Sequence, residues 1–286
     1  DGLPGVVVDR YAGTLVMKLY SSVWFPYLRD LLPLLLDSGL YERVVLRLSR
    51  NVQVLDTHGL RDGTALFGDL PDEPVLFWEN GLRFRADVVH GHKTGFFFDQ
   101  RENRARVGEI AHGSVLDVFA YAGGFSLYAA HGGAERVVSL DISEPALATA
   151  RDNFILNMHV PNVAAAQHET IAGDAFEVMA AMARRGEQFD VVVVDPPSFA
   201  KSAAEVDGAL RSYRHLAELG AALVRPRGYL VSASCSSRVS SDAFFSAVRE
   251  AITGRMVDVE TTGHAMDHPI GVPEGAYLKC MFARLL

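Results

Sequence analysis

One stretch decides the fold of this chain: Leu116-Asp117-Val118-Phe119-Ala120-Tyr121-Ala122-Gly123-Gly124-Phe125-Ser126. An apolar strand runs into a turn with two adjacent glycines, and Asp117 stands just before that turn. Glycine lets a backbone turn sharply and approach a ligand at the carboxyl end of a strand. The stretch therefore predicts the first strand and turn of a nucleotide-binding sheet. Because it lacks the full G-x-G-x-x-G spacing, a plain tight turn would also explain it.

Strands alternate with helices around this turn, from Asp99 to the end of the chain. The expected strands are residues 115–119, 136–140, 189–194, 229–233 and 277–283, and the expected helices include residues 145–156 and 242–251. Alternation of this kind is typical of a parallel sheet covered by helices on both faces. We therefore expect a doubly wound α/β domain.

The beginning of the chain predicts a second, smaller α/β domain. Its expected strands are residues 6–9, 15–19 and 44–48, with a helix at residues 24–36. A hairpin of residues 75–79 and 82–89 follows, joined by Asn80-Gly81, which is the strongest short hairpin signal. We therefore expect two domains, residues 1–78 and residues 79–286, with the hairpin leading the second.

Composition limits the class of protein. Of the 286 residues, 49% are hydrophobic and 22% are charged, as in ordinary folded domains. The apolar run at residues 31–36 is far shorter than the roughly 20 residues that span a bilayer, and no signal peptide precedes it. Cys235 and Cys280 are too few for a disulfide framework and lack the spacing of a zinc site. We expect a cytoplasmic protein without membrane attachment or a metal.

Charge is distributed unevenly along the chain. The net charge of −8 argues against a surface coated with basic residues for unspecific nucleic-acid binding. Two windows, residues 83–106 and 201–238, nevertheless carry six basic and three acidic residues each. They flank the motifs described next, although solvated helix faces would explain any single one of these residues equally well.

Two further carboxylates stand where strands end. Asp141 follows Asp117 by 24 positions, where a carboxylate can accept hydrogen bonds from both ribose hydroxyls of a nucleotide, in NAD enzymes as in others. Gly173-Asp174-Ala175 stands about one strand-helix unit later, where a carboxylate and a backbone amide can bind an adenine edge. A simple helix N-cap by Asp174 would also explain this motif.

The segment Asp195-Pro196-Pro197-Ser198-Phe199 separates the cofactor classes. It follows the run of four valines at residues 191–194, which predicts a buried central strand. The two prolines turn the chain rigidly outward and place Asp195 at the crevice of the sheet. A hydride-transfer enzyme has no use for this segment, whereas a methyltransferase needs stacking and hydrogen-bonding groups for a flipped nucleobase.

Cys235 ends another predicted strand, in Ser234-Cys235-Ser236. Most cysteines outside disulfides are buried and inert. The carboxyl end of a parallel strand is, however, the ligand-binding edge of such a sheet. We therefore interpret Cys235 as a nucleophile and Cys280, inside an apolar run, as a core residue.

With these motifs, the chain resembles the RlmI-like family of 23S ribosomal RNA 5-methylcytosine methyltransferases. The resemblance rests on Asp1-Gly-Leu-Pro-Gly-Val-Val-Val-Asp9, Glu79-Asn80-Gly81, Lys93-Thr-Gly-Phe-Phe-Phe-Asp-Gln-Arg-Glu-Asn-Arg104, the first strand-helix turn, Asp195-Pro-Pro-Ser-Phe-Ala-Lys201, Ser234-Cys235-Ser236, Asp267-His268-Pro269 and Tyr277-Leu278-Lys279-Cys280. It implies a class I methyltransferase (Rossmann-like) sheet, mostly parallel with an antiparallel last strand. Members of the family carry an N-terminal PUA domain that this sequence lacks, so we expect that Asp1 is not the natural start.

The resemblance also implies S-adenosyl-L-methionine as the cofactor. Matching motif by motif, it places Gln100 and Arg101 near the methionine moiety, Asp117 and the turn of Gly123 near the amino group, Asp141 on the ribose and Asp174 on the adenine. Tyr121, Ile142, Ala175 and Asp195 complete the expected cofactor site. Pro196, Pro197, Phe199 and Lys201 would bind the substrate, and Asp195 and Cys235 would face the target base.

The expected reaction begins with the Cys235 thiolate, which adds to carbon 6 of a cytosine so that carbon 5 can accept a methyl group. Asp195 would stabilise the adduct at the ring nitrogen. A nitrogen methyltransferase acting on guanine or adenine, and a non-catalytic RNA-binding or assembly protein, are the alternatives, with a dehydrogenase a distant third. The expected partner is large-subunit ribosomal RNA or a pre-ribosomal particle. The sequence is also compatible with a homodimer.

Overall fold

The computed structural model describes residues 2–91, 93–271 and 275–286. Its chain divides into two compact units, Asp1–Phe98 and Asp99–Leu286. Asp1, on which the expectation of an upstream start rests, lies outside the described residues. No helix among the described residues is long and apolar enough to cross a bilayer.

The first unit contains a four-stranded sheet in the order β1-β2-β3-β4. Its elements are β1 (Val6–Tyr11), β2 (Thr14–Leu19), η1 (Ser22–Tyr27), α1 (Leu28–Leu36), β3 (Arg43–Leu48), α2 (Arg50–Gln53) and β4 (Thr64–Phe67). The expected helix at residues 24–36 is divided, because Pro26 lies in a 3₁₀ turn that precedes the α-helix. The sequence did not predict α2 or β4, which are only four residues each.

The hairpin β5 (Val75–Glu79) and β6 (Leu82–Ala86) turns at Asn80 and Gly81, both with positive φ, as a two-residue hairpin requires. It lies within the first compact unit, Asp1–Phe98. The physical reason is aromatic packing, since the Phe77 ring lies edge-on to Tyr11 and to Phe96 with centroids 5.1 Å apart in each pair. The first compact unit thus extends to Phe98.

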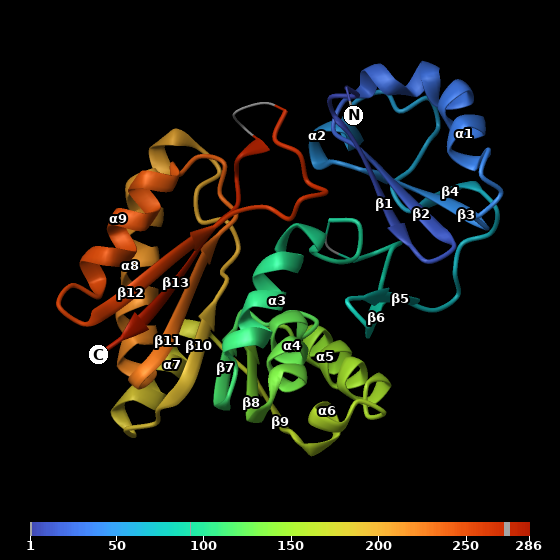
Figure 1. Ribbon diagram of the computed structural model, residues 1–286. Coiled ribbons are helices and arrows are strands. Elements are labelled where there is room, and N and C mark those ends of the chain that lie inside the picture. The colour runs from blue at the N-terminus through green and yellow to red at the C-terminus, as the bar shows by residue number, and fades with distance from the viewer. Residues whose placement is uncertain (1, 92, 272–274) are drawn as a thin grey trace. The chain divides into compact units, whose positions relative to one another are not determined.

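The second unit is built on a seven-stranded sheet in the order β12-β13-β11-β10-β7-β8-β9 (Figure 1). Its strands are β7 (Gly113–Val118), β8 (Ala134–Asp141), β9 (Gln167–Ala172), β10 (Phe189–Val194), β11 (Val224–Ser234), β12 (Met256–Thr262) and β13 (Lys279–Leu285). Neighbours from β11 to β9 pair in parallel, whereas β13 is antiparallel to β11 and to β12. The expectation of a mostly parallel sheet with an antiparallel last strand is confirmed.

Helices cover both faces of this sheet (Figure 1). They are α3 (Arg101–Ile110), α4 (Gly124–Gly132), α5 (Glu144–Leu156), α6 (Pro161–Ala165), α7 (Ala175–Arg184), α8 (Val206–Leu223) and α9 (Ser241–Ala251), with short 3₁₀ turns η2 (Phe98–Gln100) and η3 (Ala203–Glu205). Helices α4 and α5 contact β7, β8 and β9, whereas α8 contacts β10 and β11 and packs between α7 and α9. The unit is therefore doubly wound.

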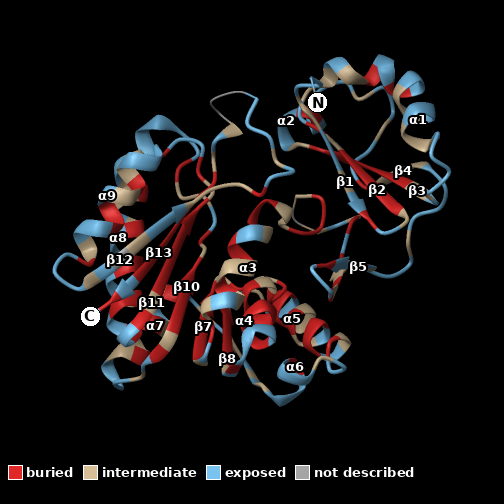
Figure 2. Cartoon of the chain, viewed as in Figure 1, coloured by how far each residue is buried: buried red, intermediate tan, exposed pale blue. Residues whose placement is uncertain are grey.

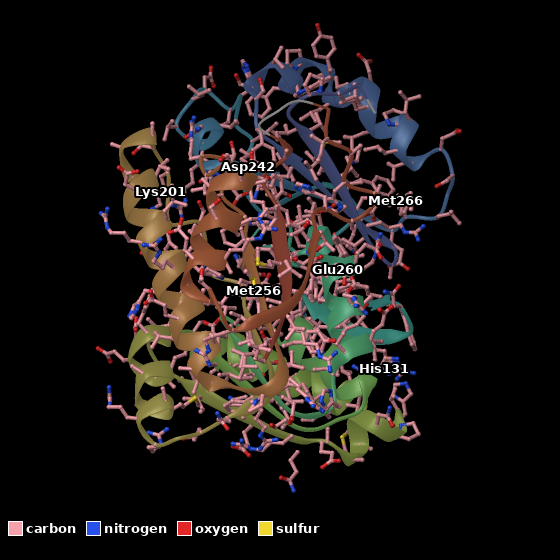
Figure 3. All side chains as sticks on the ribbon, turned by 60° about the vertical axis from the view of Figure 1, so that its left-hand side comes forward. His131, Lys201, Asp242, Met256, Glu260 and Met266 are labelled. Carbon is pink, nitrogen blue, oxygen red and sulfur yellow. The ribbon has the colours of Figure 1, made fainter. Side chains whose placement is uncertain are left out.

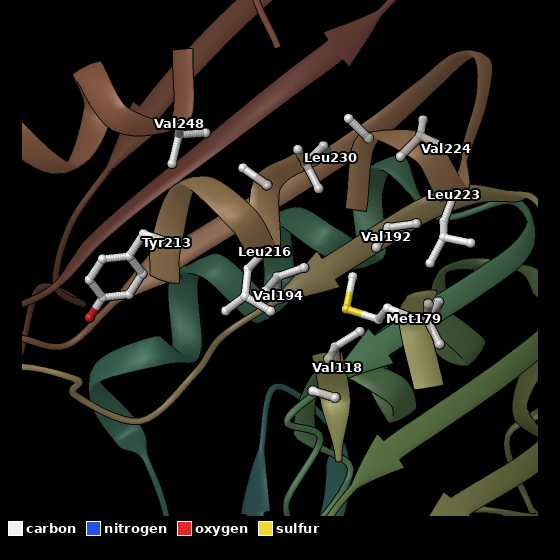
Figure 4. Close-up of a cluster of buried hydrophobic side chains, with 14 of the residues drawn as sticks. Val118, Met179, Val192, Val194, Tyr213, Leu216, Leu223, Val224, Leu230 and Val248 are labelled. Carbon is white, nitrogen blue, oxygen red and sulfur yellow. The ribbon is translucent and has the colours of Figure 1, made fainter. Parts of the chain in front are cut away.

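Side chains alternate between the two faces of each strand, and those on one face fill the apolar core beneath α7, α8 and α9. Val192 and Val194 of β10 point to this face and pack with Met179, Leu216 and other apolar side chains of the three helices (Figure 4). The central strands are buried over most of their length (Figure 2). Such burial on both faces explains why β7 and β10 could be predicted from sequence.

The position of the site follows from the order of the strands. After β7 the chain builds β8 and β9 on one side, and it then returns to build β10 and β11 on the other. The connections from β7 and β10 therefore diverge, which opens a crevice at the carboxyl ends of the two strands.

Candidate cofactor and target-base site

Asp117 lies at the carboxyl end of β7 and is 1% exposed. Its Oδ2 accepts hydrogen bonds from the amide of Ser126 at 2.9 Å and from the hydroxyl of Ser126 at 2.6 Å. Its Oδ1 is buried without a hydrogen-bond partner among the described residues. Burial raises the pKa of Asp117 to about 6. A buried carboxylate with one unused oxygen suits a cationic group of a ligand, such as the ammonium of S-adenosylmethionine.

The turn between β7 and α4 is conformationally strained. Phe119 and Tyr121 have φ of 65° and 50°, which is uncommon for residues with a side chain. Gly123 has φ of 73°, and a Cβ added to it would lie 2.8 Å from the Cβ of Ala150. Strain of this kind persists only where surrounding contacts impose it, and it is frequent at ligand sites. Gly123 thus brings bare backbone to the crevice.

Asp141, at the end of β8, holds this turn in place. Its Oδ2 accepts the amide of Tyr121 at 2.9 Å, and its Oδ1 accepts the amide of Ser143 at 2.8 Å. Each oxygen retains a second lone pair, so hydroxyl groups of a ligand can still bind there. Ile142 is 75% exposed and offers an apolar surface beside this carboxylate.

Asp174 is exposed and caps α7, because its Oδ1 accepts the amide of Glu177 at 3.1 Å. The helix-cap interpretation of Gly173-Asp174-Ala175 is therefore present in the structure. Ala175 is buried as the first residue of the helix. The cap uses only Oδ1 of Asp174, so Oδ2 can still bind the adenine of a cofactor, as the sequence predicts.

Asp195 directly follows β10 and is oriented by Gln100, whose Nε2 donates to Asp195 Oδ2 at 2.9 Å. Gln100 is 3% exposed, and its Oε1 accepts from Asn103 Nδ2 at 2.6 Å. Thr262 in turn donates its hydroxyl to Asn103 Oδ1 at 2.6 Å. The sequence missed Asn103 and Thr262 as site residues. Its one signal was the position of Asn103, three residues after Gln100 and thus one helical turn away.

Arg101 lies beside Gln100 but is held by carboxylates. Its two terminal nitrogens lie 2.6 and 3.1 Å from the two carboxylate oxygens of Asp267. The hydrogen bond that Arg101 donates to Asp267 is the largest cause of the raised pKa of Arg101. An interaction of Arg101 with the methionine moiety of the cofactor would have to share this guanidinium with Asp267.

The segment after β10 divides into buried and exposed parts. Pro196 is buried and Pro197 is exposed. Phe199 is half-buried, and its ring packs on Tyr213 with centroids 5.2 Å apart, so only part of it remains for stacking on a base. Lys201 is exposed and lies near the start of α8 on its outer side (Figure 3). Lys201 is therefore exposed to solvent, whereas Asp195 lies half-buried at the carboxyl end of the strand.

Cys235 follows the last residue of β11 and is half-buried, whereas Cys280 on β13 is fully buried. Burial raises the pKa of the Cys280 thiol well above its ordinary value. Tyr213 on α8 interacts electrostatically with both Cys235 and Asp195. This is expected because Cys235 and Asp195 follow the ends of β11 and β10, which are adjacent parallel strands. The sequence also missed Lys279, a buried lysine near Cys235.

Known proteins are similar to this chain in sequence and in fold. The model of a family described as S-adenosylmethionine-dependent methyltransferase matches residues 49–282. A ribosomal RNA large subunit methyltransferase of Deinococcus radiodurans is 48% identical, covering 100% of this chain and 70% of that protein. Ribosomal RNA large subunit methyltransferase I of Shewanella frigidimarina is 39% identical, with coverages of 100% and 72%.

Solved structures agree in fold. A methyltransferase complexed with SAH has a TM-score of 0.82 at 22% identity, over 98% of this chain and 71% of that chain. A SAM-dependent methyltransferase from Streptococcus mutans has a TM-score of 0.80 at 22% identity, with the same coverages. The family model spans most of the chain, and the relatives align along its whole length. The chain therefore belongs to the S-adenosylmethionine-dependent methyltransferase family.

Proposed function

We propose that this protein methylates carbon 5 of a cytosine in large-subunit ribosomal RNA, with Cys235 as the covalent nucleophile. The names of the curated relatives support the class of RNA. One observation supports the nucleophile: Cys235 is the accessible thiol of the two, and it stands at the carboxyl end of β11 beside the strand that carries Asp195. Ligands bind at this edge of doubly wound sheets.

The cofactor would lie across the ends of β7 and β8. We assign its amino group to Asp117 and the turn of Gly123, its ribose to Asp141 and its adenine to Asp174. Support comes from the unused oxygen of Asp117 and from the bare backbone at Gly123. When bound, S-adenosylmethionine supplies an electrophilic methyl group.

The thiolate of Cys235 would add to carbon 6 of the cytosine, forming a C–S bond and moving electron density to carbon 5. Asp195, fixed by Gln100, would stabilise the adduct by a hydrogen bond at the ring nitrogen. After carbon 5 has accepted the methyl group, a base removes the proton from carbon 5. The electron pair of that C–H bond then restores the ring double bond, and the C–S bond breaks to release the thiolate. Pro196, Pro197 and Phe199 would position the base.

A mechanism-based trap tests this proposal. Fluorine at carbon 5 cannot leave as a proton does, so the C–S bond persists after methyl transfer. The protein, incubated with 5-fluorocytidine-containing ribosomal RNA and S-adenosylmethionine, should form a denaturation-resistant adduct that peptide mass spectrometry maps to Cys235.

Substitutions provide matched controls for the trap. Cys235→Ala should abolish both the adduct and the transfer of tritiated methyl groups to unmodified RNA. Cys280→Ala removes the neighbouring buried thiol and should retain both, at some cost in stability. Methylation retained by Cys235→Ala would contradict covalent catalysis and favour a nitrogen of guanine or adenine as the target.

A further inference from the structure

Lys279 is a cation buried in the second unit, 2% exposed, at the first position of β13. Its ammonium donates hydrogen bonds to the backbone carbonyl of Ser236 and, at 2.9 Å, to that of Tyr277. No carboxylate among the described residues forms an ion pair with it. A buried charge that is not matched by an opposite charge is costly, so such a lysine requires an explanation.

The strand register explains how the lysine reaches this place. Lys279 pairs with Ser234 in the antiparallel ladder of β11 and β13. Met281, Ala283 and Leu285 belong to the apolar core beneath α8 and α9, so alternation puts Lys279 at the end of the same row. Lys279 therefore occupies a position at which the alternation of this strand would otherwise place an apolar residue.

The ammonium lies beside the backbone that carries the thiol. Ser236, whose carbonyl it binds, directly follows Cys235 in the chain. Burial lowers the pKa of Lys279 to about 8, and its interaction with Cys235 acts in the opposite direction. With a pKa of about 8, Lys279 is mostly protonated at pH 7, so a positive charge lies on the backbone next to Cys235.

We propose that Lys279 is a positioning residue for methyl transfer: its ammonium fixes the backbone at Ser236 and stabilises the thiolate form of Cys235. The effect on the thiol rests on the contact of the ammonium with the Ser236 carbonyl and on its electrostatic interaction with Cys235, whereas its catalytic consequence rests on the proposed function. The thiol proton is released to solvent, and Lys279 remains protonated throughout. The lysine would favour the thiolate before addition to carbon 6 and again when the C–S bond breaks.

Other groups around the thiol oppose or do not share this effect. Tyr213 on α8 accepts a hydrogen bond from Ser234, and burial raises its pKa, so the phenol stays neutral. Asp195, which directly follows β10 and accepts a hydrogen bond from Gln100, would repel a thiolate when ionised. Lys279 on β13 thus provides a favourable charge at this end of the sheet.

Alkylation kinetics test the proposal without RNA or cofactor. The rate of reaction of Cys235 with iodoacetamide, followed by peptide mass spectrometry between pH 5.5 and 10, reports the pKa of the thiol. In the wild type the midpoint should lie below the ordinary value of about 8.5. A wild-type midpoint at or above that value overturns the proposal, and this measurement needs no variant.

Two substitutions assign the effect to the lysine. Lys279→Met has nearly the same length but no charge, and it should raise the midpoint by about one unit, with an alkylation rate about tenfold lower at pH 7. Lys279→Arg keeps the charge and should retain most of the wild-type rate. Circular dichroism confirms that each variant is folded. A folded Lys279→Met protein with an unchanged pH profile also overturns the proposal.

The fluorocytidine trap separates this inference from the proposed function. If the trap fails while Lys279→Met still shifts the pH profile, the proposed reaction is wrong and the electrostatic role stands. If the trap succeeds and Lys279→Met lowers kcat while the KM for RNA is unchanged, both are supported. A trap that succeeds with an unshifted profile would overturn the role of Lys279 alone.

Discussion

Acidification should weaken the binding of S-adenosylhomocysteine, because we assign the amino group of this cofactor product to Asp117. Burial raises the pKa of Asp117 to about 6 in the ligand-free protein. The carboxylate is therefore almost fully ionised at pH 7.5, whereas about one tenth of it is ionised at pH 5. If the ligand's ammonium binds the ionised form, the affinity should fall about tenfold over this range, or about 1.4 kcal/mol.

Isothermal titration calorimetry with S-adenosylhomocysteine between pH 5 and pH 8 measures this effect. Below pH 6 the logarithm of the affinity should fall by about one per pH unit, because binding is linked to loss of one proton. Asp117→Asn should remove this dependence and bind about tenfold more weakly or worse at pH 7.5. Equal wild-type affinities at pH 5 and pH 7.5 would refute the reasoning, as would wild-type affinity in the Asn variant.

The same substitution should have the opposite effect on stability. A carboxyl group with a pKa near 6 when folded and an ordinary 3.8 when unfolded stabilises the fold below pH 4, and this stability is lost as the pH rises through 6. Asp117→Asn should therefore stabilise the ligand-free protein at pH 7.5 by up to about 3 kcal/mol and change little near pH 4. Urea denaturation at the two pH values measures this difference.

Asp190 offers a matched control at the other end of the sheet. Burial would raise the pKa of Asp190, but hydrogen bonds from Ser114 and Arg225 outweigh burial and hold the pKa below its ordinary value. Its stabilisation is therefore present at neutral pH and lost on acidification through the lowered pKa. Asp190→Asn should destabilise the protein at pH 7.5 and leave the affinity for S-adenosylhomocysteine unchanged.

Further outcomes are expected for neighbouring residues. Gly123→Ala should lower the melting temperature, because φ of 73° and a Cβ contact of 2.8 Å with Ala150 both disfavour a side chain. Asp141→Ala should weaken calorimetric cofactor binding by about 1–3 kcal/mol, since it leaves amides of the turn unpaired. Gln100→Leu should slow methyl transfer more than it weakens cofactor binding, because Asp195 loses its donor. Filter binding of RNA should be weak and steeply salt-dependent at a net charge of −8.

Burial determines which strands could be predicted from sequence. The strand β10, with four consecutive buried valines, was placed at residues 189–194 as observed. Strands β9 and β12 were missed because they lie at the two edges of the sheet, where one side lacks a neighbour and polar residues interrupt the pattern. Edge strands carry a weak apolar signal for this physical reason.

The site could be predicted only where its residues follow strand ends. Asp117, Asp141 and Asp195 were predicted in this way, since each stands next to an apolar run, and the structure places each at or directly after the carboxyl end of a strand. The hydrogen bond between Asn103 and Thr262 joins residues 159 positions apart, and no local pattern announces it. Tertiary contacts of this kind depend on the order of the strands in the sheet, which local patterns in the sequence do not reveal.

The two cysteines differ in burial because of their positions relative to the strand ends. Cys280 pairs with Ala233 inside the ladder, where burial raises its pKa and keeps the thiol inert. Cys235 stands just beyond Ser234, the last residue of β11, where the thiol is only half-buried. The sequence indicated this difference through strand ends alone. It did not predict Lys279, because a lysine at the start of an apolar strand is usually exposed to solvent. Only the strand register shows that Lys279 pairs with Ser234 and that its ammonium binds the carbonyl of Ser236, next to Cys235.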